Sequence, residues 1–194
     1  MIPASFNYHR ASSVNEALDL LKQYGDDARL LAGGHSLLPA MKLRMNAPAN
    51  LIDIGRIAEL NSIRVENGTL HIGAGATHSA IAASPDVQGH AAVLADTAGM
   101  IGDVQVRNKG TIGGSLAHAD PAADYPAVLL ILDASINVIG PNGTRSIAAG
   151  DFFQDLYVTA LEENEIITGV EIPAMPQGAG AVYLKFAQPA SRFA

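Results

Sequence analysis

Two pairs of adjacent glycines, each with a serine one or two residues later, are the residues best suited to chemistry in this chain of 194 residues. The first pair is Gly33-Gly34 in LAGGHS, and the second is Gly113-Gly114 in TIGGSLAHADPAAD. We call residues 31–36 the first glycine segment and residues 111–115 the second. A Gly-Gly step lets backbone N–H groups approach a ligand without a Cβ in the way, and a following serine can cap a helix whose positive end attracts an anion. Two such segments suit a diphosphate.

The first glycine segment sits between an expected strand and an expected helix. The apolar run Ala28 to Leu31 predicts a strand, the glycines predict a turn, and Ser36 is suited to cap an apolar helix from Leu37 to Met45, in which Pro39 is tolerated near the start. The run is neither GxGxxG nor a Walker loop, because no Gly-Lys-Ser/Thr follows, so some other nucleotide fold is needed. The competing interpretation is a plain tight turn.

Two carboxylates follow the second glycine segment. Asp120 is best placed to cap an apolar helix from about Pro121 to Leu132, whereas Asp124, one turn further along, is the better acceptor for ribose hydroxyls. His118 and these two carboxylates could in principle ligate a metal, but the other histidines are scattered and no second cluster supports it, so we expect no metal site.

Other polar residues have a structural explanation beside a functional one. Arg107 and Lys109 precede the second glycine segment and either neutralise a phosphate or belong to the loop. His71 and His78 flank the run GAGAT, but their spacing matches no metal-binding helix. His71 alternates with apolar neighbours as an outward strand residue would, and GAGAT is expected to form a turn.

Longer motifs carry a family resemblance. AGGHSLLPAMKLR, VRNKGTIGGSLAHADPAADYPAVLLILDA, EIITGVEIP and KFAQPASRFA resemble, in this order, the FAD-binding medium subunit of molybdenum hydroxylases, the carbon monoxide dehydrogenase and xanthine dehydrogenase family. The resemblance covers nearly the whole chain. It implies an α+β fold of the vanillyl-alcohol-oxidase type, in which both glycine segments clasp the pyrophosphate of a non-covalently bound FAD.

The same resemblance implies a set of cofactor contacts. Asp124 would contact the adenosine half, Ile167 would offer a backbone contact near the flavin ring, and Lys185 would lie near the flavin. The cofactor-binding residues implied in this way are Ala32, Gly33, Gly34, His35, Ser36, Thr111, Ile112, Gly113, Gly114, Ser115, Asp124, Ile167 and Lys185. No catalytic residue is expected, because a flavin itself performs the redox chemistry.

The function implied is electron transfer within a larger complex. A molybdenum large subunit would oxidise the substrate, and an iron-sulfur small subunit would pass electrons to FAD on this chain, in a heterotrimer or its dimer. The motifs are more similar to those of the carbon monoxide dehydrogenase type, although a xanthine or aldehyde dehydrogenase type stays open. Two alternatives remain: a self-standing flavin oxidase of the same broad fold, and a non-catalytic domain that has lost FAD.

Composition narrows the classes of partner. The formal net charge is −7 and no basic run occurs, which argues against a nucleic-acid surface. Hydrophobic residues make up 48% of the chain without forming an apolar stretch of membrane-spanning length, and the first residues do not resemble a secretory signal, so we expect a cytoplasmic protein. The chain has no cysteine to bind an iron-sulfur cluster, so any cluster must lie on a partner.

The pattern of elements indicates two parts and the start of a third. Residues 1–57 are expected to form a small βαβ unit with the first glycine segment, in which Ser13 caps a helix that ends at Gly25. Residues 58–176 are expected to form a larger, mainly antiparallel α+β unit with the second glycine segment and with hairpins around Asn67-Gly68 and around 141–143. Residues 177–194, with the strand-like run YLKFAQ, are expected to begin a third domain of about 100 residues. The family's third domain covers one side of the flavin, and we expect it to be missing here, in a fragment or a natural truncation.

Overall fold

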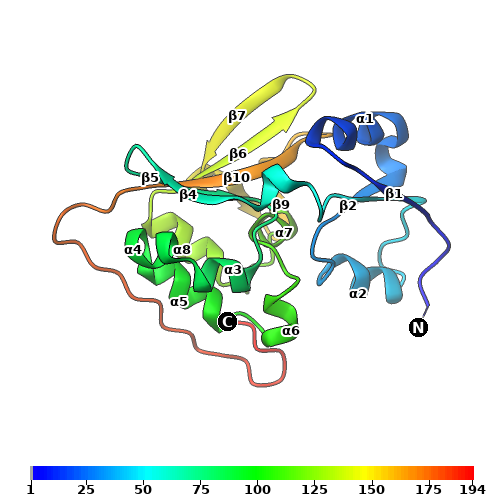
Figure 1. Ribbon diagram of the computed structural model, residues 1–194. Coiled ribbons are helices and arrows are strands. Elements are labelled where there is room, and N and C mark those ends of the chain that lie inside the picture. Colours follow the sequence, from blue (N-terminus) through cyan, green and yellow to red (C-terminus); the bar gives the residue numbers. More distant parts are fainter. Residues whose placement is uncertain (1) are drawn as a thin grey trace.

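The computed structural model describes residues 2–194, and their strands form three sheets. Figure 1 shows the larger sheet lying over a layer of helices, with the smaller three-stranded sheet beside it. The strands are β1 (Asn7–Arg10), β2 (Ala28–Leu31), β3 (Asn50–Asp53), β4 (Ile63–Glu66), β5 (Thr69–Gly73), β6 (Ser135–Gly140), β7 (Gly143–Ala148), β8 (Phe153–Asp155), β9 (Val158–Thr159) and β10 (Ile166–Pro173).

The helices are short. The α-helices are α1 (Val14–Tyr24), α2 (Leu37–Lys42), α3 (His78–Ala83), α4 (Pro85–His90), α5 (Ala92–Met100), α6 (Val104–Arg107), α7 (Ile112–His118), α8 (Tyr125–Ile131) and α9 (Ala149–Phe152). Two 3-10 helices complete the set, η1 (Gly25–Asp27) and η2 (Ala58–Asn61).

The N-terminal unit is the βαβ arrangement expected from the sequence. Its three parallel strands have the order β1-β3-β2, and α1 joins β1 to β2. Helix α1 begins where the Ser13 hydroxyl accepts a bond from the Glu16 N–H, and it ends at Gly25. It buries Val14, Ala17 and Leu21 against the sheet. The first glycine segment begins at the end of β2 and therefore lies at the edge of this unit.

The first expected helix is shorter than the sequence indicates. Helix α2 ends at Lys42 rather than Met45, and Arg44 adopts a left-handed φ of 60° that cannot continue a helix. Ser36 occupies the N-cap position, but its side chain makes no capping bond. Its backbone is already helical, with φ −104° and ψ −51°, whereas a capping residue normally has an extended backbone.

The larger unit is an antiparallel sheet with the strand order β4-β5-β10-β6-β7. Both expected hairpins form, β4–β5 around Asn67-Gly68 and β6–β7 around the turn at 141–142. Asn67 and Gly68 have φ of 51° and 79°, as a type I′ turn requires. Helices α3, α4, α5 and α8 cover one face of this sheet (Figure 1), with fully buried side chains such as Leu94 and Tyr125 between the layers.

The expected helix from Pro121 to Leu132 is wrong at its start. The Asp120 carboxylate accepts a bond from the Ala122 N–H at 2.9 Å, which closes a turn, and α8 begins only at Tyr125. Asp120 is therefore not the cap of this helix. The second glycine pair lies in a helix of its own, α7, which starts at Ile112.

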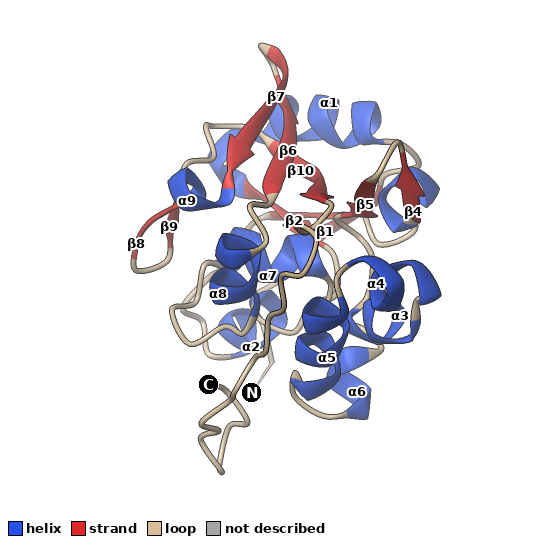
Figure 2. Ribbon diagram, turned by 90° about the vertical axis from the view of Figure 1, so that its left-hand side faces the viewer, coloured by secondary structure: helices blue, strands red, loops and turns tan. Residues whose placement is uncertain are grey.

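Residues 174–194 form a tail without a helix or a strand, so the strand expected at YLKFAQ is wrong. Figures 1 and 2 show the tail leaving β10, passing outside the helices and returning beneath them. The alternation that suggested a strand is real: Tyr183 and Lys185 turn inward, while Leu184 and Phe186 are 84% and 97% exposed. A strand needs a hydrogen-bonded neighbour, and none of the described residues pairs with this run.

The two main sheets occupy consecutive stretches of chain, 7–53 and 63–173. The boundaries expected at 57/58 and 176/177 stay predictions. Among residues 2–194 no helix has both the length and the apolar character that a bilayer crossing requires.

Candidate functional site

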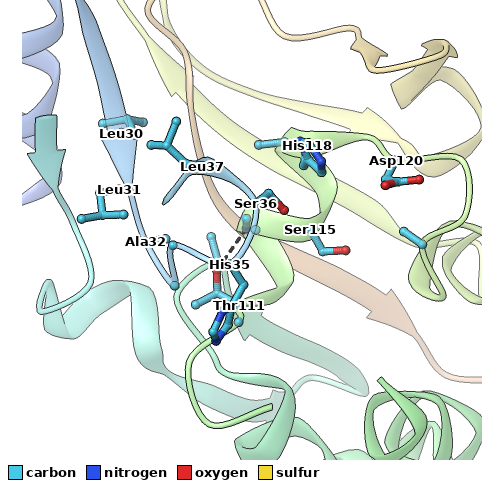
Figure 3. Close-up of a pocket in the computed structure, with 18 of the residues that line it drawn as sticks. Leu30, Leu31, Ala32, His35, Ser36, Leu37, Thr111, Ser115, His118 and Asp120 are labelled. Carbon is cyan, nitrogen blue, oxygen red and sulfur yellow. Dashed lines mark hydrogen bonds between the residues drawn. The ribbon is translucent and has the colours of Figure 1, made fainter. Parts of the chain in front are cut away.

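A cavity of about 530 Å³ lies where the two units meet. Both units line it: the first glycine segment comes from one side, and α7, the 120–124 turn and β10 come from the other. Figure 3 shows side chains of the two glycine segments, among them His35, Ser36, Thr111 and Ser115, gathered around this space. The structure thus brings together two segments about 80 residues apart in the sequence, as the sequence predicts.

The first glycine segment presents unused backbone donors to the cavity. The N–H groups of Ala32 through Ser36 donate no hydrogen bond to any of residues 2–194, and all five of these residues line the cavity. Ala32, Gly33, Gly34 and Ser36 are half-buried and His35 is exposed, so these N–H groups are open to a ligand. A run of free backbone donors in a concave site suits an anion. This arrangement fits the phosphates of a dinucleotide.

The two glycines of this segment are required for different structural reasons. Gly34 has a φ of +75°, which side chains other than glycine rarely adopt. Gly33 lies so close to the second unit that an added Cβ would come within 2.1 Å of the Lys109 carbonyl oxygen and 2.8 Å of the Gly110 Cα. The first glycine segment therefore rests directly on the backbone that leads into the second.

The second glycine segment differs from expectation, because the N–H groups of residues 112–115 are already used. Gly113 N–H donates to the Ala74 carbonyl at 2.8 Å, and Gly114 N–H donates to the Thr111 hydroxyl at 3.1 Å. The run GAGAT at 73–77 is therefore more than a turn, since its carbonyls hold the start of α7. This segment contributes a glycine surface without side chains and the Ser115 hydroxyl, rather than free amide donors.

Thr111 provides a first test of this local geometry. Its hydroxyl caps α7, and replacing such a cap by alanine costs about 1 kcal/mol. We expect Thr111→Ala to lower the free energy of unfolding by that amount in urea titrations, and Thr111→Ser to retain it. Equal stability of Thr111→Ala and the wild type would show that the cap does not hold α7.

Asp124 and Lys185, two of the residues that the resemblance implies for FAD, form an ion pair with each other. Lys185 Nζ lies 2.8 Å from Asp124 Oδ1, the Tyr183 hydroxyl donates to the same oxygen at 2.8 Å, and both charged side chains are less than 10% exposed. Burial and the bond to Asp124 raise the pKa of Tyr183. Asp124 thus lines the cavity and also holds the tail against it.

The remaining predicted site residues differ in their position relative to the cavity. Ile112 is fully buried at the start of α7 and does not line the cavity. Ile167 is buried in β10 and lines the cavity. Arg107 does not face an anion, because its guanidinium donates to the carbonyls of Ile101 and Gly102 at 3.0 and 3.2 Å, as the loop interpretation expects. The ring of His118 lies against Tyr157, with centroids 5.3 Å apart and planes tilted by 57°. No group of three His, Asp or Glu side chains within residues 2–194 could hold a metal.

Sequence reasoning considered His78 only as a metal ligand paired with His71 and missed its place at the cavity. Its side chain is only 5% exposed, it lines the cavity, and its Nδ1 lies 2.9 Å from the hydroxyl of the fully buried Tyr125. Burial lowers the pKa of His78 to about 4, with smaller contributions from His35 and Arg107. One sequence signal could have indicated the burial of His78. Thr77 caps α3, so His78 is the first residue of a helix and lies on the same face as the buried Ile81, three residues later.

His78 makes the stability of the fold depend on acid. The pKa of His78 in the folded state, about 4, lies below its ordinary value of 6.5, so the unfolded state binds more protons between these values. The free energy of unfolding therefore falls as the pH drops from about 6.5 to about 4. We expect His78→Gln to flatten this part of the profile, measured by urea unfolding at pH 7, 5 and 4. An unchanged acid dependence in His78→Gln would assign it to other groups.

The chain is similar to known proteins over most of its length. The model of the FAD binding domain in molybdopterin dehydrogenase matches residues 4–175. This chain belongs to that family of FAD-binding domains. Relatives include the carbon monoxide dehydrogenase medium chain of Hydrogenophaga pseudoflava, 50% identical over 185 residues, which cover 95% of this chain and 64% of that protein. The glyceraldehyde dehydrogenase medium chain of Sulfolobus acidocaldarius is 39% identical over 194 residues, which cover 100% of this chain and 68% of that protein.

Solved structures of the family confirm the fold expected from the motifs. A structure of carbon monoxide dehydrogenase from Hydrogenophaga pseudoflava superposes with a TM-score of 0.90 at 50% identity, covering 92% of this chain and 62% of that chain. Quinoline 2-oxidoreductase from Pseudomonas putida 86 gives a TM-score of 0.87 at 36% identity, covering 90% and 61%. As an FAD-binding domain of this family, the chain spans 64% of the length of the Hydrogenophaga relative.

Proposed function

We propose that this chain binds FAD with the pyrophosphate on the first glycine segment and the glycine face of α7 opposite. The observation that carries the proposal is the run of five unused N–H donors, Ala32 to Ser36, at a cavity shared by both units. On the opposite side, the absence of a side chain at Gly114 leaves room for the phosphates, because an added Cβ there would meet only the Thr111 hydroxyl. The residues present therefore fit the cofactor for which the family is named.

The other proposed cofactor contacts follow from their places around the cavity. Asp124 accepts hydrogen bonds at one end, and Ile167 in β10 offers the backbone contact near the flavin ring. Lys185 does not line the cavity but pairs with Asp124, so we assign it to the same end of the site as Asp124. When bound, FAD supplies one- and two-electron redox chemistry, and the chain's own residues bind and orient it. No side chain is assigned a proton-transfer role.

We further propose that the chain is the electron-transfer subunit of a molybdenum hydroxylase complex. Its relatives are medium chains of dehydrogenases named for substrates as different as carbon monoxide and glyceraldehyde, which supports a role away from the substrate. In this proposal a molybdenum large subunit oxidises the substrate and an iron-sulfur small subunit feeds electrons to FAD, in a heterotrimer or its dimer. The expected cytoplasmic location stays part of the proposal.

Turnover tests the relay role. We expect the purified chain, loaded with FAD, to show no oxidation of aldehydes, purines or carbon monoxide with an artificial acceptor. Co-purification with the iron-sulfur and molybdenum subunits should restore turnover, because only they hold the remaining centres. Robust substrate oxidation by the chain alone would overturn the relay role and favour a self-standing flavin oxidase.

A further inference from the structure

We propose that His78 is a positioning residue that sets the spacing between the two glycine segments. The inference rests on the proposed FAD site and concerns a residue that the cofactor motifs do not include. His78 belongs to α3, outside both glycine segments, yet its ring lies between the buried interior of the larger unit and the backbone that enters the second segment.

One side of the imidazole is fixed by Tyr125. The hydroxyl of Tyr125 lies 2.9 Å from His78 Nδ1, and the ring centroids are 5.3 Å apart. Tyr125 is fully buried at the start of α8, between the sheet and the helices, so it cannot turn away. The backbone of His78 is fixed as well, because its N–H donates to the Gly110 carbonyl at 3.0 Å.

The other edge of the imidazole supports Gly110. A Cβ added to Gly110 would come within 2.6 Å of His78 Nε2 and 2.9 Å of its Cδ2, so the ring edge is in direct contact with this backbone. The neighbouring contact is Gly33, which lies against Lys109 and Gly110. Tyr125, His78, Gly110 and Gly33 therefore form a continuous column from α8 to the first glycine segment.

Through the contacts in this column, the rigid core fixes the position of the free N–H donors. Protein interiors are close-packed, so a change in the size of one member displaces the next rather than being absorbed. A displaced Gly110 would move the surface on which Gly33 rests, and with it the five donors that begin at Ala32. His78 thus acts on the cofactor through the backbone.

A double-mutant cycle in FAD affinity tests the column. We expect Gly110→Ala to weaken FAD binding about tenfold in the wild-type background and by less than about twofold in His78→Ala, because the smaller side chain leaves room for the new Cβ. Affinity is measured by flavin fluorescence titration of each apoprotein below its unfolding temperature. Equal fold losses of affinity in both backgrounds would overturn the proposal.

The unfolding temperature of each apoprotein separates positioning from simple packing. If His78 only packs against Gly110, the effects of the two substitutions would be non-additive in the unfolding temperature but additive in FAD affinity. That result would also overturn the proposal. His90→Ala is the matched control, because His90 is partly buried and hydrogen-bonded to the Ile172 carbonyl but lies outside the cavity, so its FAD affinity should equal that of the wild type.

Tyr125→Phe keeps the proposal testable if Gly110→Ala does not fold, since it removes only the hydroxyl that holds the ring. We expect a several-fold faster release of FAD from Tyr125→Phe, and an unchanged release rate would contradict the column. Failure of the wild-type chain to bind FAD at all would instead count against the proposed function.

Discussion

Gly114→Val is expected to abolish most FAD binding while leaving the fold intact. Gly114 lines the cavity, and a Cβ placed there would meet only the Thr111 hydroxyl at 2.8 Å, with otherwise open space around it. A valine side chain would therefore project into the volume proposed for the pyrophosphate. We expect FAD affinity to fall about 100-fold, as overpacking of a few kcal/mol implies.

The control is another helical glycine with open space around it. Gly99 is exposed on α5, has no atom within 4 Å of its added Cβ and does not line the cavity. Gly99→Val should bind FAD as the wild type does, and both variants should unfold at similar temperatures. Full FAD affinity in Gly114→Val would remove the second glycine segment from the site.

Asp124→Ala is expected to weaken FAD binding by one to two orders of magnitude. A hydrogen bond to a charged group is worth roughly 1.5–3 kcal/mol, and Asp124 is the buried carboxylate at the cavity. The flavin absorption spectrum of the bound cofactor should stay unchanged if Asp124 contacts the adenosine half. Titration of the apoprotein with FAD measures the loss, and unchanged affinity would make Asp124 purely structural.

Lys185→Met distinguishes two ways in which Asp124 could act. Lys185 and Tyr183 attach the tail to Asp124, so an indirect effect through the tail should appear in Lys185→Met with the same size as in Asp124→Ala. A direct contact to the cofactor should appear in Asp124→Ala alone. Limited proteolysis of residues 174–194 in the Lys185 variant reports whether the tail has been released.

Local patterns predicted most of the fold because they depend on neighbouring residues. The Ser13 cap, the Gly25 stop and the Asn67-Gly68 turn each act within a few residues, and each appears in the structure. The start of α8 failed for a related reason. Asp120 followed by Pro121 is compatible with a helix cap and with a turn, and only the tertiary position of Tyr125 in the core decides between them.

The sequence predicted where the site lies, but it did not predict which N–H groups are free or that His78 lines the cavity. Glycine pairs indicate where a backbone can approach a ligand, but they do not show whether its N–H groups are free. Whether they are free depends on partners far away in the sequence. The Gly113 N–H donates to the Ala74 carbonyl, whereas the N–H groups of Gly33 and Gly34 donate to no group in residues 2–194. His78 was missed because its burial comes from Tyr125, 47 residues away.

The most direct test of the FAD site is an equilibrium titration of the apoprotein with FAD, with riboflavin as the comparison. Riboflavin has the same ring but lacks the pyrophosphate that the five free N–H donors are proposed to hold. We predict saturable one-to-one binding of FAD, with riboflavin at least about 100-fold weaker. Equal affinity for the two ligands, or no FAD binding at millimolar concentration, would contradict the account.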